Sequence, residues 1–93
     1  MPTTYIFEHG KIHRAIHTLN TELLYIRYVR GYFVGVFKGA HGEHITHVSK
    51  NGDKFYCTCN YHLITGKPCK HIVSLIFELQ RRGLLKKAKI SIK

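Results

Sequence analysis

Four residues constrain the fold of this chain more than any other feature: Cys57, Cys59, Cys69 and His71. They form the pattern Cys-x-Cys, nine intervening residues, and Cys-x-His, and they include every cysteine of the sequence. Three thiolates and one imidazole are a complete ligand set for a closed, tetrahedral, structural zinc site. A catalytic zinc site usually has three protein ligands and an open position for water. The pattern therefore predicts one structural zinc ion.

The ligand spacing also predicts local structure. Cys57 and Cys59 are two residues apart, so on a strand both side chains point to one face and can reach one ion at the strand end. Cys69 and His71 cannot both face an ion from inside a helix, because two residues are about 200° apart around its axis. Pro68 suits the start of a helix. We therefore expect Cys69 to lie in the turn just before a helix.

Two other interpretations of the cysteines fit less well. They could be ordinary buried apolar residues. A disulfide framework would leave one of the three cysteines unpaired, and the N-terminal residues do not resemble a secretion signal. Zinc binding uses all three.

The same residues resemble the SWIM zinc finger family, whose pattern is Cys-x-Cys, a variable gap and Cys-x-His. Residues 31–36 (GYFVGV) resemble the family's first hairpin strand, residues 57–59 (CTC) its zinc-binding strand end, and residues 66–73 (GKPCKHIV) its turn into the final helix. The resemblance covers Leu24 to Arg82. It implies a ββα arrangement, zinc ligation by Cys57, Cys59, Cys69 and His71, and binding to DNA or proteins. His62 is a competing ligand within the loop, and we favour His71 because it holds the position of the family pattern.

The fold class we predict is α+β: a small, zinc-bound, three-stranded antiparallel sheet, a C-terminal helix and an extra short N-terminal helix. The strand regions are 23–37, 43–49 and 54–59, with a hairpin turn at Asn51-Gly52 and a bulge or strong twist at Gly31 and Gly35. The helices are 10–19 and 72–82. A short edge strand is expected at 5–8. We expect one domain over 1–93, made of an N-terminal extension (1–22), the zinc module (24–82) and a basic tail (84–93).

Side-chain periodicity predicts which residues face the core. In the C-terminal helix an apolar stripe should face the sheet: Ile72, Val73, Leu75, Ile76 and Leu79. Ser74 and Glu78 fall on the other side of that helix. In the second strand region Ile45 and Val48 are expected to point inward. The tail alternates from Lys89 to Lys93, which fits an extra edge strand or a basic arm.

Two further groups of histidines were considered as metal sites. His9, His13 and His17 share one helix face if the helix reaches back to His9, and we favour a solvent-exposed polar face over a second metal site. His41, His44 and His47 are three residues apart, which suits a helix better than the strand predicted there. We assign no metal to either group.

The charge of the chain indicates a polyanionic partner. Fifteen Lys and Arg against five Asp and Glu give a formal net charge of +10. We expect nucleic acid, DNA in first place, bound with weak sequence specificity because phosphate contacts carry little sequence information. The basic residues expected to contact phosphates are Lys67, Lys70, Arg81, Arg82, Lys86, Lys87 and Lys89. The simpler alternative is a solvated basic surface that keeps the protein soluble.

Other functions are less consistent with the sequence. A protein-interaction adaptor or homodimer could use the aromatic strand region 25–37, and such a role is compatible with DNA contact. An enzyme is not expected, because the predicted zinc site is full and the five carboxylates include no close pair. No small-molecule substrate and no membrane partner is expected. The absence of a signal peptide pattern favours a cytoplasmic, nucleoid or nuclear location over secretion.

Overall fold

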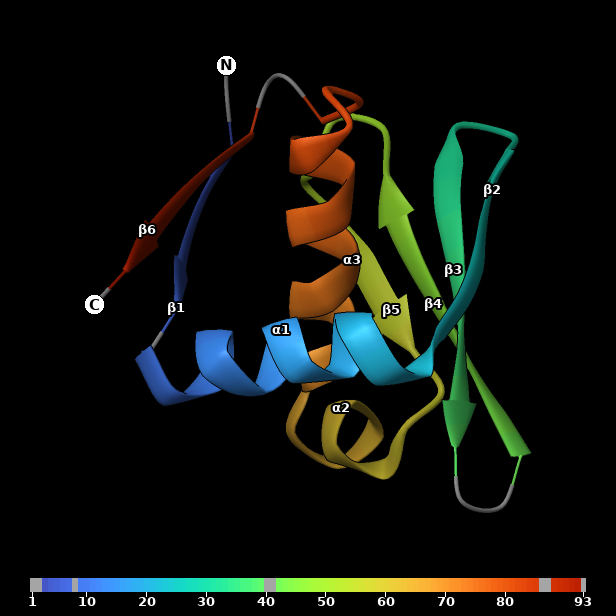
Figure 1. The fold of residues 1–93 in the computed structure, drawn as a ribbon. Helices are drawn as coiled ribbons and strands as arrows, with labels where there is room; N and C mark the ends of the chain where they lie inside the picture. The colour runs from blue at the N-terminus through green and yellow to red at the C-terminus, as the bar shows by residue number, and fades with distance from the viewer. Residues whose placement is uncertain (1–2, 8, 40–41, 86–87, 93) are drawn as a thin grey trace.

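The computed structural model describes residues 3–7, 9–39, 42–85 and 88–92, and it describes no side chain before residue 10 or after residue 85. The fold is α+β, as predicted from the sequence (Figure 1). In chain order the elements are β1 (Thr3–Phe7), α1 (His9–Glu22), β2 (Leu23–Val29), β3 (Tyr32–Gly39), β4 (Gly42–Ser49), β5 (Phe55–Cys57), α2 (Asn60–Thr65), α3 (Lys70–Arg81) and β6 (Ala88–Ile92).

A four-stranded antiparallel sheet, in the order β2-β3-β4-β5, forms one side of the molecule. Helix α3 packs against one face of this sheet, and α1 crosses α3 on the side away from the sheet (Figure 1). The predicted apolar stripe of α3 is confirmed, because Ile72, Val73, Leu75, Ile76 and Leu79 have no exposed surface. They meet Phe33, Phe37 and Val48 of the sheet in a single core.

The predicted number of strands was too low, because residues 23–37 form two strands instead of one. Arg30 and Gly31 have φ angles of 48° and 86°, and they make a two-residue turn between β2 and β3. Positive φ at both central residues fits the right-handed twist of a hairpin. The expected bulge at Gly31 is therefore a turn, and it adds a strand to the sheet.

Helix α1 is longer than predicted, and it explains a second error. It continues through residues 20–22, beyond its predicted end at residue 19. Ser74 and Glu78 are buried instead of solvent-exposed: Ser74 lies against α1, and Glu78 pairs with Arg81 and Arg82. The Ser74 hydroxyl lies 2.7 Å from the carbonyl oxygen of Ala15 in α1 and 2.6 Å from that of Lys70 in α3, so both acceptors for its one hydrogen lie at this interface. Sequence periodicity could not show that α3 is covered on two sides.

The strand and loop predictions need three smaller corrections. Ile45 is 41% exposed, and Thr46 takes the inward position next to buried Val48. The expected loop between Cys59 and Cys69 contains the short helix α2. The tail forms strand β6, which pairs with β1 in parallel as a separate two-stranded sheet instead of extending the main one.

None of the helices in the described part of the chain has the length and apolar character needed to cross a lipid bilayer.

The close approach of α3 to the sheet depends on Gly35. A Cβ added at this residue would lie 3.0 Å from Cδ1 of Leu75, which is fully buried and has little room to move. We expect Gly35→Val to lower the free energy of unfolding by about 1–3 kcal/mol through overpacking. Denaturant unfolding of the zinc-loaded protein measures this effect.

The matched control is Gly10→Ala, because no atom lies within 4 Å of the added carbon. This change should leave the free energy of unfolding unchanged or raise it by up to about 1 kcal/mol, since alanine is the better helix former. Equal stability of Gly35→Val and the unaltered protein would contradict the close packing at Leu75.

Candidate metal centre

The four predicted zinc ligands come together at one point, beside the N-terminal end of α3. Cys57 is the last residue of β5, and Cys59 is the N-cap of α2. Cys69 is the N-cap of α3, as the spacing predicted, and His71 lies in the first turn of that helix. Neither capping cysteine uses its side chain to cap its helix, so both sulfurs are available to a metal.

The arrangement of the donor atoms fits a tetrahedral zinc ion. All four donor atoms lie within 4.8 Å of one another, and all four residues are buried. Nδ1 of His71 is 3.8 Å from Sγ of Cys57 and 3.8 Å from Sγ of Cys69. A nitrogen and a sulfur bound to zinc at about 2.1 Å and 2.3 Å in a tetrahedron are about 3.6 Å apart, so little movement is needed to enclose the ion. Nδ1 is thus the nitrogen placed to bind it.

The electrostatics of the cysteines favour an ionised site. Hydrogen bonds from Cys69, His71 and Thr46 lower the pKa of Cys57 to about 3, against the effect of burial. The hydroxyl of Thr46 donates directly to the Cys57 sulfur over 3.4 Å. Cys69 shares a hydrogen bond with the Cys57 sulfur and is buried, and without a metal both effects raise the pKa of the Cys69 thiol. A doubly charged cation would remove this competition by binding both sulfurs as thiolates.

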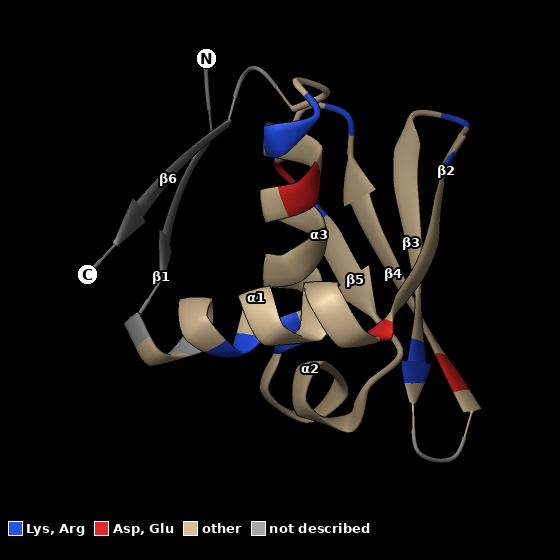
Figure 2. Cartoon of the chain, viewed as in Figure 1, with Lys and Arg blue, Asp and Glu red and all other residues tan. Residues whose placement is uncertain are grey.

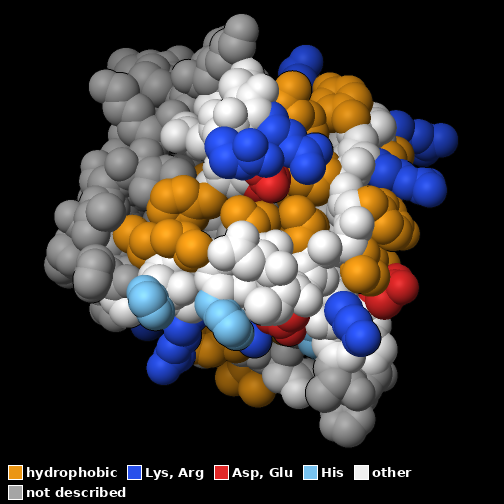
Figure 3. Space-filling view, in the orientation of Figure 1, with side chains coloured by type: hydrophobic (Ala, Val, Ile, Leu, Met, Phe, Trp, Pro, Cys, Tyr) orange, Lys and Arg blue, Asp and Glu red, His pale blue; other side chains and the backbone are white. Residues whose placement is uncertain are grey.

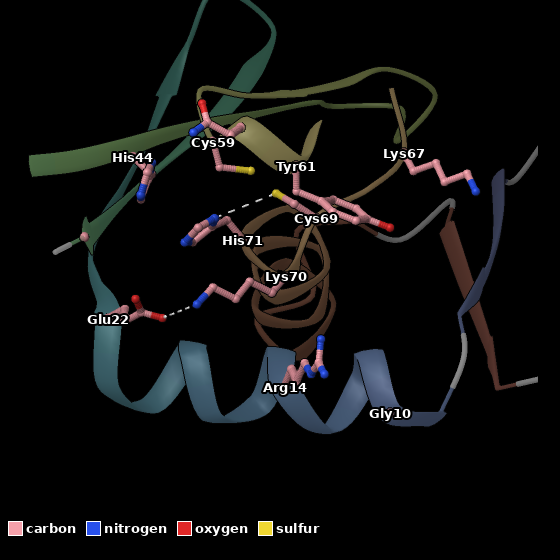
Figure 4. A pocket seen from close by; sticks show the side chains of 12 residues that line it. Gly10, Arg14, Glu22, His44, Cys59, Tyr61, Lys67, Cys69, Lys70 and His71 are labelled. Carbon is pink, nitrogen blue, oxygen red and sulfur yellow. Dashed lines mark hydrogen bonds and ion pairs between the residues drawn. The ribbon is translucent and has the colours of Figure 1, made fainter. Parts of the chain in front are cut away.

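The His71 ring is held by neighbouring rings. The ring centroid of Phe37 lies 5.2 Å from that of His71, and the centroid of His44 lies 4.7 Å away at an interplanar angle of 34°. Figure 4 shows His71 between His44 and Cys69. His62 lies elsewhere: its Nδ1 donates to the carbonyl oxygen of Lys67 over 2.9 Å. The structure thus selects His71 over His62.

The other histidines do not form a second site in the described part of the chain, where the only group with metal-binding geometry is the zinc cluster. Helix α1 does begin at His9, and His13 and His17 are exposed on it, as we favoured. The side chain of His9 and all of His41 lie outside the described residues. His44 and His47 point to opposite faces of β4, since His44 contacts the His71 ring and His47 contacts Tyr32 and Tyr56.

A basic cleft opens beside the zinc cluster. Its volume is about 1020 Å³, and its basic lining residues are Lys67, Lys70 and Arg14. Figure 4 shows these three side chains around the mouth of the cleft, next to Tyr61. Glu22 is its one acidic lining residue, and its carboxylate lies 3.5 Å from Nζ of Lys70. Sequence reasoning missed Arg14, because only the packing of α1 on α3 brings it to the zinc end of the molecule.

The other basic residues predicted to contact phosphates are not gathered at this cleft. Arg81 and Arg82 lie at the far end of α3, where both pair with the buried carboxylate of Glu78. Figure 3 shows these basic side chains around one acidic group. Arg81 lies eleven positions after Lys70 in the helix, which corresponds to about 16 Å along the helix axis. Lys86 and Lys87 lie outside the described residues, as does the side chain of Lys89.

Among the residues that the structure describes, the remaining Lys and Arg are spread over several elements instead of forming one continuous basic face (Figure 2). A concentrated basic group near the metal centre is therefore found only in the cleft, as far as the described side chains show.

Comparison with known protein families agrees with the geometry. The family model of the SWIM zinc finger matches residues 47–80, about a third of the chain. The matched range contains all four ligands, β5, α2 and most of α3. The segment 31–36, which resembles the family's first hairpin strand, lies outside that range. Searches of curated proteins and of solved structures found no match.

Proposed function

Since residues 47–80 form a SWIM zinc finger with a ligand set for one structural zinc, we propose that this protein is a zinc-stabilised nucleic-acid-binding module. We propose DNA as its principal partner and weak sequence specificity. The observation that carries the proposal is the basic cleft. Its lining contains three cationic side chains, those of Arg14, Lys67 and Lys70, and only one carboxylate. The net charge of +10 supports it.

The cleft is suited to phosphate because the zinc site fixes its wall. Lys67 and Lys70 flank Cys69, so zinc ligation holds the backbone that carries both lysines. Helix α1 adds Arg14 from the other side. Three cations on rigid elements can neutralise phosphates with little loss of side-chain freedom, and release of counterions from the nucleic acid then drives binding.

Removing one cation of the cleft should weaken DNA binding equally for all sequences. For Arg14→Gln, Lys67→Gln and Lys70→Gln we expect a lower affinity, with the slope of log K against log salt reduced in magnitude by about 0.9 per lost phosphate contact. Fluorescence anisotropy titrations of a DNA duplex at several salt concentrations measure both quantities.

Arg81→Gln is the charge-matched control. It removes one positive charge of the same kind at the other end of α3, from a guanidinium already paired with Glu78. Its effect on the salt slope should be smaller than that of Arg14→Gln. Equal effects would mean that net charge, and not the cleft, determines binding.

A salt-independent affinity, or no binding to DNA or RNA, would contradict the proposal. In that case the adaptor role becomes the better hypothesis. It is favoured by the exposed apolar side chains of α2, since Leu63 is 55% and Ile64 is 82% exposed.

A further inference from the structure

The face of the main sheet that points away from α3 carries aromatic side chains from all four strands. We call it the outer sheet face. Directly paired residues of neighbouring strands project to the same side, so the strand register defines its members. They are Tyr25, Arg27 and Val29 of β2, Tyr32, Val34, Val36 and Lys38 of β3, Glu43, Ile45, His47 and Ser49 of β4, and Tyr56 of β5.

Most of this face is open to solvent, although Val36 and Ser49 on it are buried. Helices α1 and α3 and strands β1 and β6 lie on the other side of the sheet (Figure 1). Tyr25, Tyr32 and Tyr56 are 46%, 37% and 45% exposed, and Ile45 is 41% exposed. Contiguous apolar and aromatic surface of this kind marks an interaction site more often than scattered apolar residues do.

The aromatic rings form a continuous band across the strands. The ring centroids of Tyr32 and His47 are 6.3 Å apart, those of His47 and Tyr56 are 6.0 Å apart, and Tyr56 is 5.7 Å from His62 of α2. On β2 the guanidinium of Arg27 lies 5.2 Å from the ring centroid of Tyr25. These contacts hold the rings side by side while leaving part of each accessible.

The charges on this face indicate which kind of partner it can bind. Arg27 and Lys38 lie on it, Arg30 lies in the turn at its edge, and Glu43, opposite Lys38, is its one acidic member. A second copy of the chain would bring Arg27 and a net charge of +10 against the same charges, which disfavours self-association. A partner with both negative charge and flat aromatic faces fits better. Bases of a duplex are stacked on one another, whereas those of a single strand are free to stack on side chains.

We propose that the outer sheet face is a stacking platform for single-stranded nucleic acid. Two or three bases would stack on Tyr32, His47 and Tyr56, with the phosphates directed to Arg27 and Arg30. This inference rests on the proposed nucleic-acid-binding function and adds a strand preference and a second surface to it. The platform and the basic cleft use different residues, so they can be tested separately.

The test compares Tyr32→Ile and Tyr56→Ile with the unaltered protein. Isoleucine keeps an apolar, strand-forming side chain and removes the ring. Binding is measured with a labelled oligothymidylate and with a labelled DNA duplex. We expect each variant to lose about 5- to 150-fold in affinity for the single strand, which corresponds to the loss of one base–aromatic stack, and to retain its affinity for the duplex. Zinc content and circular dichroism confirm folding.

Three controls sharpen the comparison. Tyr32→Phe and Tyr56→Phe keep the ring and should bind the single strand normally. Tyr28→Ile removes a tyrosine that is 56% exposed but whose ring contacts Phe33 on the α3 side of the sheet, and it should have no effect. The sequence contains no tryptophan, so tyrosine emission is observable, and stacked bases should quench it in the unaltered protein.

The outcomes separate this inference from the function on which it rests. If the isoleucine variants bind both probes normally while Arg14→Gln weakens both, the nucleic-acid module is supported and the platform is overturned. Binding to neither probe overturns both proposals. A change of oligomeric state in the isoleucine variants, with single-strand affinity unchanged, overturns the platform and assigns the face to self-association.

Discussion

Zinc-free protein is expected to be unfolded. The three cysteine ligands belong to the hydrophobic core, and Cys69 and His71 fix the first turn of α3, whose apolar side chains fill that core. Structural zinc contributes about 10–16 kcal/mol to the folding of zinc-finger peptides, whereas domains are stable by only about 5–15 kcal/mol. Loss of the ion should therefore abolish the native state instead of loosening one loop. Chelator titration followed by circular dichroism and native mass spectrometry measures the coupling.

Cys69→Ser should reproduce the effect of the chelator in the presence of zinc. His62→Ala is the matched control, because His62 lies in the same loop but binds only the carbonyl oxygen of Lys67. It should bind one zinc and remain folded. Acidification should release the ion, since protons compete for the three thiolates as the pH falls. A folded, reduced and metal-free chain would show that the cluster is not a structural zinc site.

Phe37→Ala should produce the second largest loss of stability, and it should also weaken zinc binding. Phe37 is fully buried and its ring packs on His71. Truncation of a buried phenylalanine lowers the free energy of unfolding by about 3–5 kcal/mol. If only the folded chain holds zinc, the same free energy reduces the apparent zinc affinity by about 150- to 4,000-fold. Competition with a metal-binding dye measures this affinity.

Ile64→Ala is the control for that experiment. Ile64 also belongs to the zinc-finger segment, but its side chain is 82% exposed on α2. It should keep the zinc affinity of the unaltered protein. A stability loss in Phe37→Ala with no change in zinc affinity would mean that the metal site forms independently of the core.

The zinc site and α3 could be predicted because their signals are local in the sequence. Ligand spacing placed Cys69 before the helix, and the repeat of apolar residues from Ile72 to Leu79 defined its buried face. The basic cleft could not be predicted, since Arg14 joins Lys67 and Lys70 only through the crossing of α1 over α3.

The sheet was harder to predict than the helix because turn and bulge signals look alike in a strand-rich segment. Gly31 is compatible with either a bulge or a turn within residues 23–37. In the structure, positive φ at both Arg30 and Gly31 shows that the chain turns there. That turn changes which residues share a face: in one continuous strand Tyr32 and Val34 would alternate onto the same face as Ile26, whereas in the hairpin they lie with Tyr25 and Arg27 on the outer sheet face. The aromatic band became visible only once the register was known.

The parallel pair of β1 and β6 has a consequence for the order in which the chain assembles. It joins Thr3 to Ala88 across about 80 connecting residues, whereas β4 and β5 are joined by five. The longer connection has about 16 times as many residues as the shorter one, which is four doublings of length. Each doubling raises the entropic free-energy cost of loop closure by about 0.6 kcal/mol, so the difference is about 2.4 kcal/mol. Local hairpins should therefore form early, and the β1–β6 pair should form late, once zinc and the core have already brought its two strands within reach.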